Sequence, residues 1–151
     1  MKKHELTDDT ITVGGRILHR IKALKSFSDV EEGDLGGYVE KEDNPDHSGE
    51  AWVSGNARVY GNARVSGDAR VSGDARVSGE NDYAAAKGFG REYRTTTFFR
   101  LQDGGIGVRC GCFCGTLEEF REKVKETHKE SKMGKEYLML ADLMEYKFKN
   151  A

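Results

Sequence analysis

The hydrophobic pattern is most regular between Ala51 and Glu80, where five units of six residues follow one another. Each unit has alanine first, valine third and glycine fifth, and its second residue is arginine in all but the first unit. Residues two apart on a strand share a face, so the alanine and valine point inward and the second residue points outward. Glycine and the residue after it supply a corner. The pattern predicts a mainly β fold built on a short left-handed parallel β-helix of about two to three coils.

The six-residue phase continues on both sides of these units. Val39 lies fourteen residues before Val53, which fits two further sides with a two-residue insertion, and Tyr83 lies six residues after Val77. So short a solenoid exposes both ends, and we expect the flanking segments to cap it and oligomerisation to supplement it. The predicted parts are an N-terminal β cap over 1–44, the β-helix over 45–86 and a C-terminal α+β module over 87–151.

The flanking segments carry strand and helix patterns. A β-hairpin is predicted over 11–18 around Gly14-Gly15, although Ile17, Ile21 and Leu24 also suit one face of a helix. In the C-terminal part, strands over 95–101 and 106–113 are predicted to form a second hairpin, followed by two helices. The first helix begins with a capping box of Thr116 and Glu119, and the second covers 133–148. The predicted apolar stripes of the helices are Leu117, Phe120 and Val124, and Tyr137, Leu140, Ala141, Met144 and Phe148.

Composition and charge narrow the range of partners. The formal net charge of −2 gives no global basic field, which disfavours a nucleic-acid polymer as partner. No stretch approaches the ~18 apolar residues of a spanning helix, and no signal-peptide pattern follows Met1, so we expect no membrane contact and a cytoplasmic location. An odd number of cysteines, crowded between 110 and 114, favours reduced thiols over a disulfide framework.

Those three cysteines are the only candidate metal ligands by spacing. On one strand, Cys110, Cys112 and Cys114 would spread their sulfurs over roughly 13 Å, too far for tetrahedral zinc. We therefore expect no metal and no cofactor, and we interpret the cysteines as small buried side chains that face the helices. A partial site at Cys112 and Cys114 stays open as an alternative.

Charged and aromatic residues occupy the outward positions of the repeats. The arginines Arg58, Arg64, Arg70 and Arg76 form either an ion-paired surface coat or, between neighbouring chains, an anion site that binds phosphates. Trp52 replaces arginine in the first unit and Tyr60 replaces serine in the second. We expect both aromatic side chains to be exposed and to contact another subunit or the N-terminal cap. Trp52 is also predicted to lie on the same face as Arg70, within cation–π distance.

Three stretches carry a resemblance to known proteins: Asp34–Glu40, the Gly-Asn/Asp-Ala-Arg-Val units, and the run from Thr95 to Phe120. Over nearly all of its length the chain resembles a group of small phage- and prophage-encoded proteins of unassigned mechanism. The repeats also resemble the hexapeptide-repeat superfamily, whose best-known members are trimeric acyltransferases. The resemblance implies a viral or prophage origin, a location in the host bacterial cytosol, and interference with host processes or defence.

These observations favour a non-enzymatic homo-oligomer, with a trimer preferred, that inhibits a host defence factor or sequesters a nucleotide signal. Its partner would be a host protein or a phosphate-bearing small molecule. One alternative is an acyltransferase with His47 as general base. His47 lies in the insertion before the first regular unit, but no protruding loop follows it, and a solvated turn residue is the preferred interpretation. A structural component of a virus particle is the other alternative.

Overall fold

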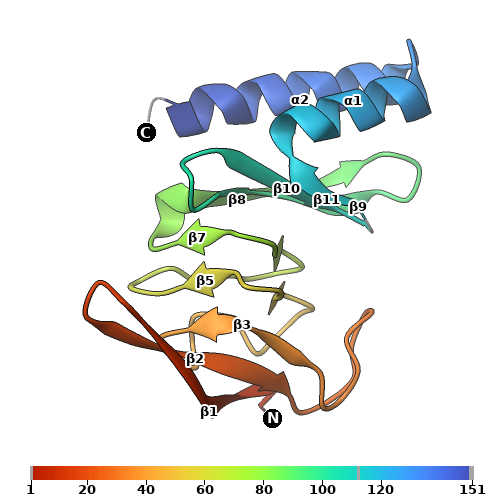
Figure 1. Ribbon diagram of the computed structural model, residues 1–151. Helices are drawn as coiled ribbons and strands as arrows, with labels where there is room; N and C mark the ends of the chain where they lie inside the picture. The colour runs from red at the N-terminus through yellow and green to blue at the C-terminus, as the bar shows by residue number, and fades with distance from the viewer. Residues whose placement is uncertain (1, 112, 150–151) are drawn as a thin grey trace.

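The computed structural model describes residues 2–111 and 113–149. It stacks the chain in layers from its N-terminal to its C-terminal end: a β-hairpin, the repeats, a second sheet and a pair of helices (Figure 1). The repeats form a β-solenoid at the centre of a mainly β molecule. These layers and the loops between them position the charged and aromatic side chains of the candidate sites.

The N-terminal layer is the predicted hairpin. Strands β1 (His4–Val13) and β2 (Arg16–Ala23) pair antiparallel, and Gly14 and Gly15 make the turn with positive φ angles of 55° and 80°. Glycine reaches such angles without the steric penalty of a side chain. Because β2 continues as a strand to residue 23, the helical alternative for this segment is wrong.

One side of the solenoid extends the hairpin sheet. Strands β3 (Leu35–Val39), β5 (Arg58–Val59) and β7 (Arg76–Val77) run parallel, and β3 also pairs antiparallel with β2. Val39, Val59 and Val77 are aligned across these strands and are fully buried. The inward phase predicted from the sequence is therefore confirmed on this side.

The other two sides carry fewer pairings. Strands β4 (Trp52–Val53) and β6 (Arg70–Val71) run parallel, and Pro45 forms a parallel bridge with Val65. Since Pro45 is in phase with Val65, the extra residues of the insertion lie after Pro45, in the segment that contains His47. The alanines and valines of all five repeats are at most 1% exposed, which confirms the predicted core.

The C-terminal module contains a larger sheet than the predicted hairpin. Its antiparallel strands, in the order β11-β10-β9-β8, are β8 (Tyr83–Phe89), β9 (Arg94–Arg100), β10 (Ile106–Cys110) and β11 (Phe113–Thr116). A 3-10 turn, Glu80–Asp82, precedes β8. Tyr83 therefore begins this sheet instead of forming another side of the solenoid, although its ring packs against the solenoid core. The predicted return strand over 106–113 ends at Cys110.

Strand β9 belongs to two hydrophobic cores. Phe99 packs with the solenoid valines, whereas its neighbour Phe98 packs among the helices. Successive residues of a strand point to opposite faces, so one sheet serves both cores. The contact with the solenoid is completed by an antiparallel bridge between Ala75 and Leu101.

Two helices lie side by side over the outer face of this sheet (Figure 1). Helix α1 (Leu117–His128) begins with the predicted capping box of Thr116 and Glu119, and α2 is Lys132–Lys149. All residues of both predicted apolar stripes are buried. No helix among the described residues is long and apolar enough to cross a membrane.

Trp52 is buried, which corrects the expectation that it is exposed. Only 2% of the residue is accessible, because the ring of Phe27 lies edge-on 5.4 Å away and the ring of His4 lies 6.3 Å away. Trp52 was predicted to contact either another subunit or the N-terminal cap, and it contacts the N-terminal cap of its own chain. Trp52 and Arg70 are aligned in neighbouring strands, as predicted, but the described residues show no cation–π contact between the two side chains.

Candidate ligand-binding site

The repeat arginines lie in different surroundings. Arg58 and Arg76 are aligned on β5 and β7, whereas Arg64 is exposed on another side. The Nε of Arg76 donates to the hydroxyl of Tyr60, 3.0 Å away. Tyr60 is half-buried, which corrects the expectation that it is exposed. Within one chain the four arginines do not converge, so an anion site made from them alone would need neighbouring chains and stays a prediction.

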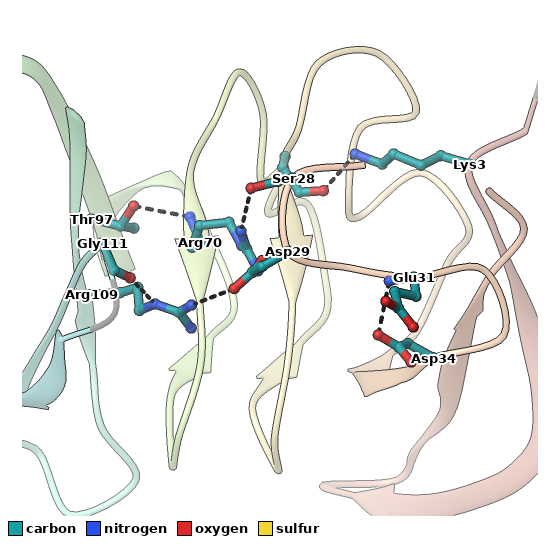
Figure 2. Close-up of polar contacts among 10 residues, drawn as sticks. Lys3, Ser28, Asp29, Glu31, Asp34, Arg70, Thr97, Arg109 and Gly111 are labelled. Atoms are coloured by element: carbon teal, nitrogen blue, oxygen red, sulfur yellow. Dashed lines mark hydrogen bonds and ion pairs between the residues drawn. The ribbon is translucent and has the colours of Figure 1, made fainter. Parts of the chain in front are cut away.

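Arg70 forms a site with residues outside the repeats (Figure 2). Its Nη2 donates to Oδ1 of Asp29 at 2.7 Å, and Nη2 of Arg109, on β10, donates to Oδ2 of the same carboxylate at 3.3 Å. Residues of the N-terminal loop, the solenoid and the C-terminal sheet therefore meet at one carboxylate. The hydrogen bond and the charge of Arg70 hold the pKa of Asp29 below its usual value.

These side chains line a hollow of about 420 Å³, which we call the arginine pocket. Its charged lining consists of the cations Arg70, Lys87, Arg94 and Arg109 and the acids Asp29, Glu50 and Asp68. Lys87 pairs with Asp68 at 3.4 Å. The pocket is polar and open, a setting in which charge rather than apolar burial would select a ligand.

A second hollow of about 560 Å³ lies between the C-terminal sheet and its helices. We call it the aromatic pocket because five of its lining residues carry aromatic rings: Phe89, Phe113, Phe120, His128 and Tyr137. Adjacent rings have centroids 5.6 to 6.3 Å apart. The cations Arg91, Arg94 and Lys123 and the acid Glu92 also line it. Arg94 lines both pockets, so the two hollows are neighbours.

Tyr137 supplies a polar group to the aromatic pocket. Burial raises the pKa of its hydroxyl, and the nearby Cys110 thiol, 3.8 Å from it, acts in the same direction. The hydroxyl is therefore protonated at neutral pH and can donate a hydrogen bond. Gly90, with a φ of 79°, leaves room for this hydroxyl, because a Cβ there would collide with it.

His47 packs in the N-terminal layer. Its ring stacks 4.1 Å from that of His4 at an interplanar angle of 3°, and its Nδ1 accepts the backbone N–H of Lys3 at 3.0 Å. Burial lowers the pKa of His4 to about 4 and that of the Lys3 ammonium to about 8. The buried Lys3 Nζ donates to the carbonyl of Ala51 at 2.5 Å. His47 is thus half-buried and packs against His4, which corrects the expectation of a solvated turn residue. A catalytic role for it stays a prediction.

Cys110 and Cys114 do not share one face. Cys110 and Cys114 lie on the neighbouring strands β10 and β11, because Gly111 turns the chain with a φ of 58°. Cys110 is half-buried and faces Tyr137, whereas Cys114 is exposed, with its Sγ 3.1 Å from the hydroxyl of Ser72. The interpretation of all three as buried side chains facing the helices is therefore wrong for Cys114. Cys112 lies outside the described residues.

Sequence reasoning missed most of the residues that line these pockets. Arg109 and Asp29 are 80 residues apart, and neither belongs to a repeat. One local signal was available for the aromatic pocket, since Phe113 precedes the predicted helix pair and Phe120 and Tyr137 lie in it. The helical stripes account for the last two without a cavity.

The comparisons with known proteins support the solenoid. No curated protein matches the chain significantly. The chain is similar to the YdcK Beta solenoid repeat family over residues 51–67 and 57–71, two overlapping stretches inside the repeat array.

Proposed function

We propose that the protein is a non-enzymatic binding protein that sequesters a nucleotide or a similar aromatic, phosphate-bearing molecule in the aromatic pocket. One observation carries the proposal: an aromatic-walled hollow of about 560 Å³ has cationic side chains among its lining. A base or similar flat ring stacks on aromatic side chains. Arginine and lysine bind phosphate oxygens.

The division of labour between pocket residues follows from their chemistry. Phe89, Phe113 and Phe120 would contact the ring, and the Tyr137 hydroxyl would donate to an acceptor on it. Lys123 and Arg91 are exposed at the edge and would bind the phosphate. Such a pocket needs no reacting group, which agrees with a binding role.

A nucleotide panel tests the proposal. Mono-, di- and cyclic nucleotides are titrated into the full chain by calorimetry, with the corresponding nucleosides and inorganic phosphate as controls. We expect at least one nucleotide to bind, and Lys123→Glu to weaken it at least about tenfold. Lys125→Glu, two residues away on α1 and outside the pocket, is the matched control and leaves affinity unchanged. If no nucleotide binds, or if both variants weaken binding equally, the proposal fails.

The proposal also includes assembly into a homo-oligomer, with a trimer preferred. Met139, Leu143 and Tyr146 are 57 to 69% exposed and lie at helical spacing along α2, as expected of a covered surface. The molar mass in solution tests the assembly. Leu143→Glu should lower the mass, whereas the control Lys41→Glu, at an exposed position in the N-terminal part of the chain, should not.

Finer features of the sequence-based interpretation belong to the same proposal. They are a left-handed coil of about two to three turns, a phage or prophage origin, action against host defence and a location in the host cytosol. The six-residue period supports the coil, and the resemblance described above supports the rest. Appearance of the protein early in infected cells, and not in purified particles, would agree with this role and contradict a particle component.

A further inference from the structure

We infer that Arg70 and Arg109 form a phosphate-binding site that the chain's own Asp29 occupies as a stand-in anion. The site lies in the arginine pocket and is separate from the aromatic pocket of the proposed function. Its ligand is a phosphate group, either free or carried as a monoester.

The charges at this site are unequal. The side chains of Arg70 and Arg109 are only 15% and 16% exposed, whereas that of Asp29 is 62% exposed. Two guanidinium groups with a combined charge of +2 face one carboxylate with a charge of −1. A phosphate dianion would balance both.

The hydrogen bonds are also incomplete. Asp29 reaches Nη2 of Arg70, while Nε on the same edge of the guanidinium is buried and has no hydrogen-bond partner among the described residues. A buried donor without a partner costs free energy. Phosphate has more acceptor oxygens than a carboxylate and can engage Nε and Nη2 of Arg70 together while still contacting Arg109.

Asp29 can leave without unfolding its loop. Phe27 and Val30 bond to each other through both of their backbone N–H groups, at 2.9 and 2.8 Å, and both pack against the solenoid core. Only Ser28 and Asp29 form the exposed tip between them (Figure 2). Ser28 has a φ of 51°, a left-handed conformation that serine rarely adopts. The exposed Asp29 side chain can therefore turn away from the arginines while the backbone of the loop stays closed.

The other cations of the pocket are paired, so the charge open to a ligand comes from Arg70 and Arg109. Lys87 pairs with Asp68, and Arg94 pairs with Glu92. The carbonyl of Gly111 holds Arg109 in place by accepting its Nε–H at 2.8 Å. The backbone N–H of Arg70 is held by the hydroxyl of Thr97 at 3.0 Å. The C-terminal sheet thus positions the side chain of Arg109 and the backbone of Arg70, whereas the Arg70 guanidinium donates to Ser28 Oγ at 3.4 Å and to Asp29 at 2.7 Å.

The test compares Asp29→Asn with Glu31→Gln, a change of equal charge in the same loop but outside the pocket. Inorganic phosphate and methyl phosphate are titrated into each full-length variant by calorimetry. We expect Asp29→Asn to bind phosphate at least about tenfold more tightly than the unaltered chain or Glu31→Gln. Equal affinities in the three proteins would overturn the inference. This gain with either compound supports the inference, and the two arms distinguish a free ion from an esterified phosphate.

A second measurement assigns the binding to the two arginines. In the Asp29→Asn background, Arg109→Gln should remove the gain in affinity, and Arg64→Gln, at an exposed repeat position, should keep it. The Nε–H NMR signal of Arg70 should shift on addition of phosphate to Asp29→Asn. A gain that survives Arg109→Gln, or an Nε–H signal that does not respond, would contradict the inference. If Asp29 only holds the loop against the two arginines, its replacement lowers stability and creates no phosphate binding.

Discussion

The solenoid and the C-terminal module bury apolar side chains on β-sheets with different residues. The solenoid core is made mostly of alanine and valine at repeated positions. The C-terminal core contains Phe98, Phe120, Tyr137 and Phe148, none of which is part of a repeat. Small side chains in register fill a narrow interior, whereas the large rings packed between a sheet and two helices have an open hollow beside them. The repeats supply the centre of the stack, and the irregular module supplies the larger of the two pockets.

The largest effect that tests this contrast is expected from Phe98→Ala. Phe98 is fully buried, and removal of a buried phenylalanine ring costs about 3 to 5 kcal/mol. Val65→Ala, at an equally buried solenoid position, removes less apolar surface and should cost about 2 kcal/mol. Urea unfolding of both variants measures the two losses. Equal losses would mean that the two cores do not differ as their side chains suggest.

The next effect is a pH dependence located at the N-terminal end of the solenoid. His4 binds its proton near pH 4 in the folded chain and near pH 6.5 when unfolded. Between these values the unfolded state binds more protons, so the free energy of unfolding falls as the pH drops from about 6.5 to about 4. The loss should be on the order of 2 kcal/mol, after allowance for screening by water.

This dependence can be followed through Trp52, the only tryptophan, whose ring lies 6.3 Å from that of His4. Urea unfolding by tryptophan fluorescence at several pH values gives the free energy of unfolding. His4→Gln removes the titrating group, so its stability should fall less over the same pH range. If the variant and the unaltered chain lose the same free energy, His4 is not the cause.

A smaller effect is expected at the start of α1, where the C-terminal module depends on a local signal. The Thr116 side chain accepts the N–H of Glu119 at 3.2 Å, and Thr116→Ala leaves that donor without its cap. The expected loss is about 1 kcal/mol. Thr116→Ser keeps the oxygen and should change stability by only a few tenths of a kcal/mol. Thermal unfolding of both variants measures the difference, and a similar loss in both would show that the cap does not stabilise the helix.

The contrast between the regions also explains which parts of the fold the sequence predicts. The solenoid core, the first hairpin and both helices follow from local periods and caps, and these predictions are confirmed. Strand β8 was missed because Ala84, Ala85 and Ala86 show no alternation of apolar and polar residues. Its pairing with β9 depends on packing against the neighbouring strand, and the sequence of β8 alone does not predict it.

The candidate sites were less predictable for the same reason. The period correctly places Arg70 on the outer surface, but its partner Arg109 comes from a strand 39 positions later and their shared Asp29 from a loop. The burial of Trp52 likewise depends on Phe27, in a loop whose path over the solenoid has no local signal. The Arg70 site and the burial of Trp52 both depend on contacts between layers, whereas the repeat pattern predicts only contacts within the solenoid.

The smallest effect is expected from Arg64→Ala, and it tests whether surroundings or repeat position determine the role of an arginine. Arg64 and Arg70 occupy the same place in identical flanking sequence, Ala-Arg-Val-Ser-Gly-Asp. Arg64 is exposed, so its loss should change the free energy of unfolding by less than about 0.5 kcal/mol. Arg70→Ala removes a largely buried group that bonds Asp29 and should cost more, about 1 to 3 kcal/mol. Urea unfolding of the matched pair decides the question, because equal losses would show that the contacts between layers add nothing to what the repeat itself provides.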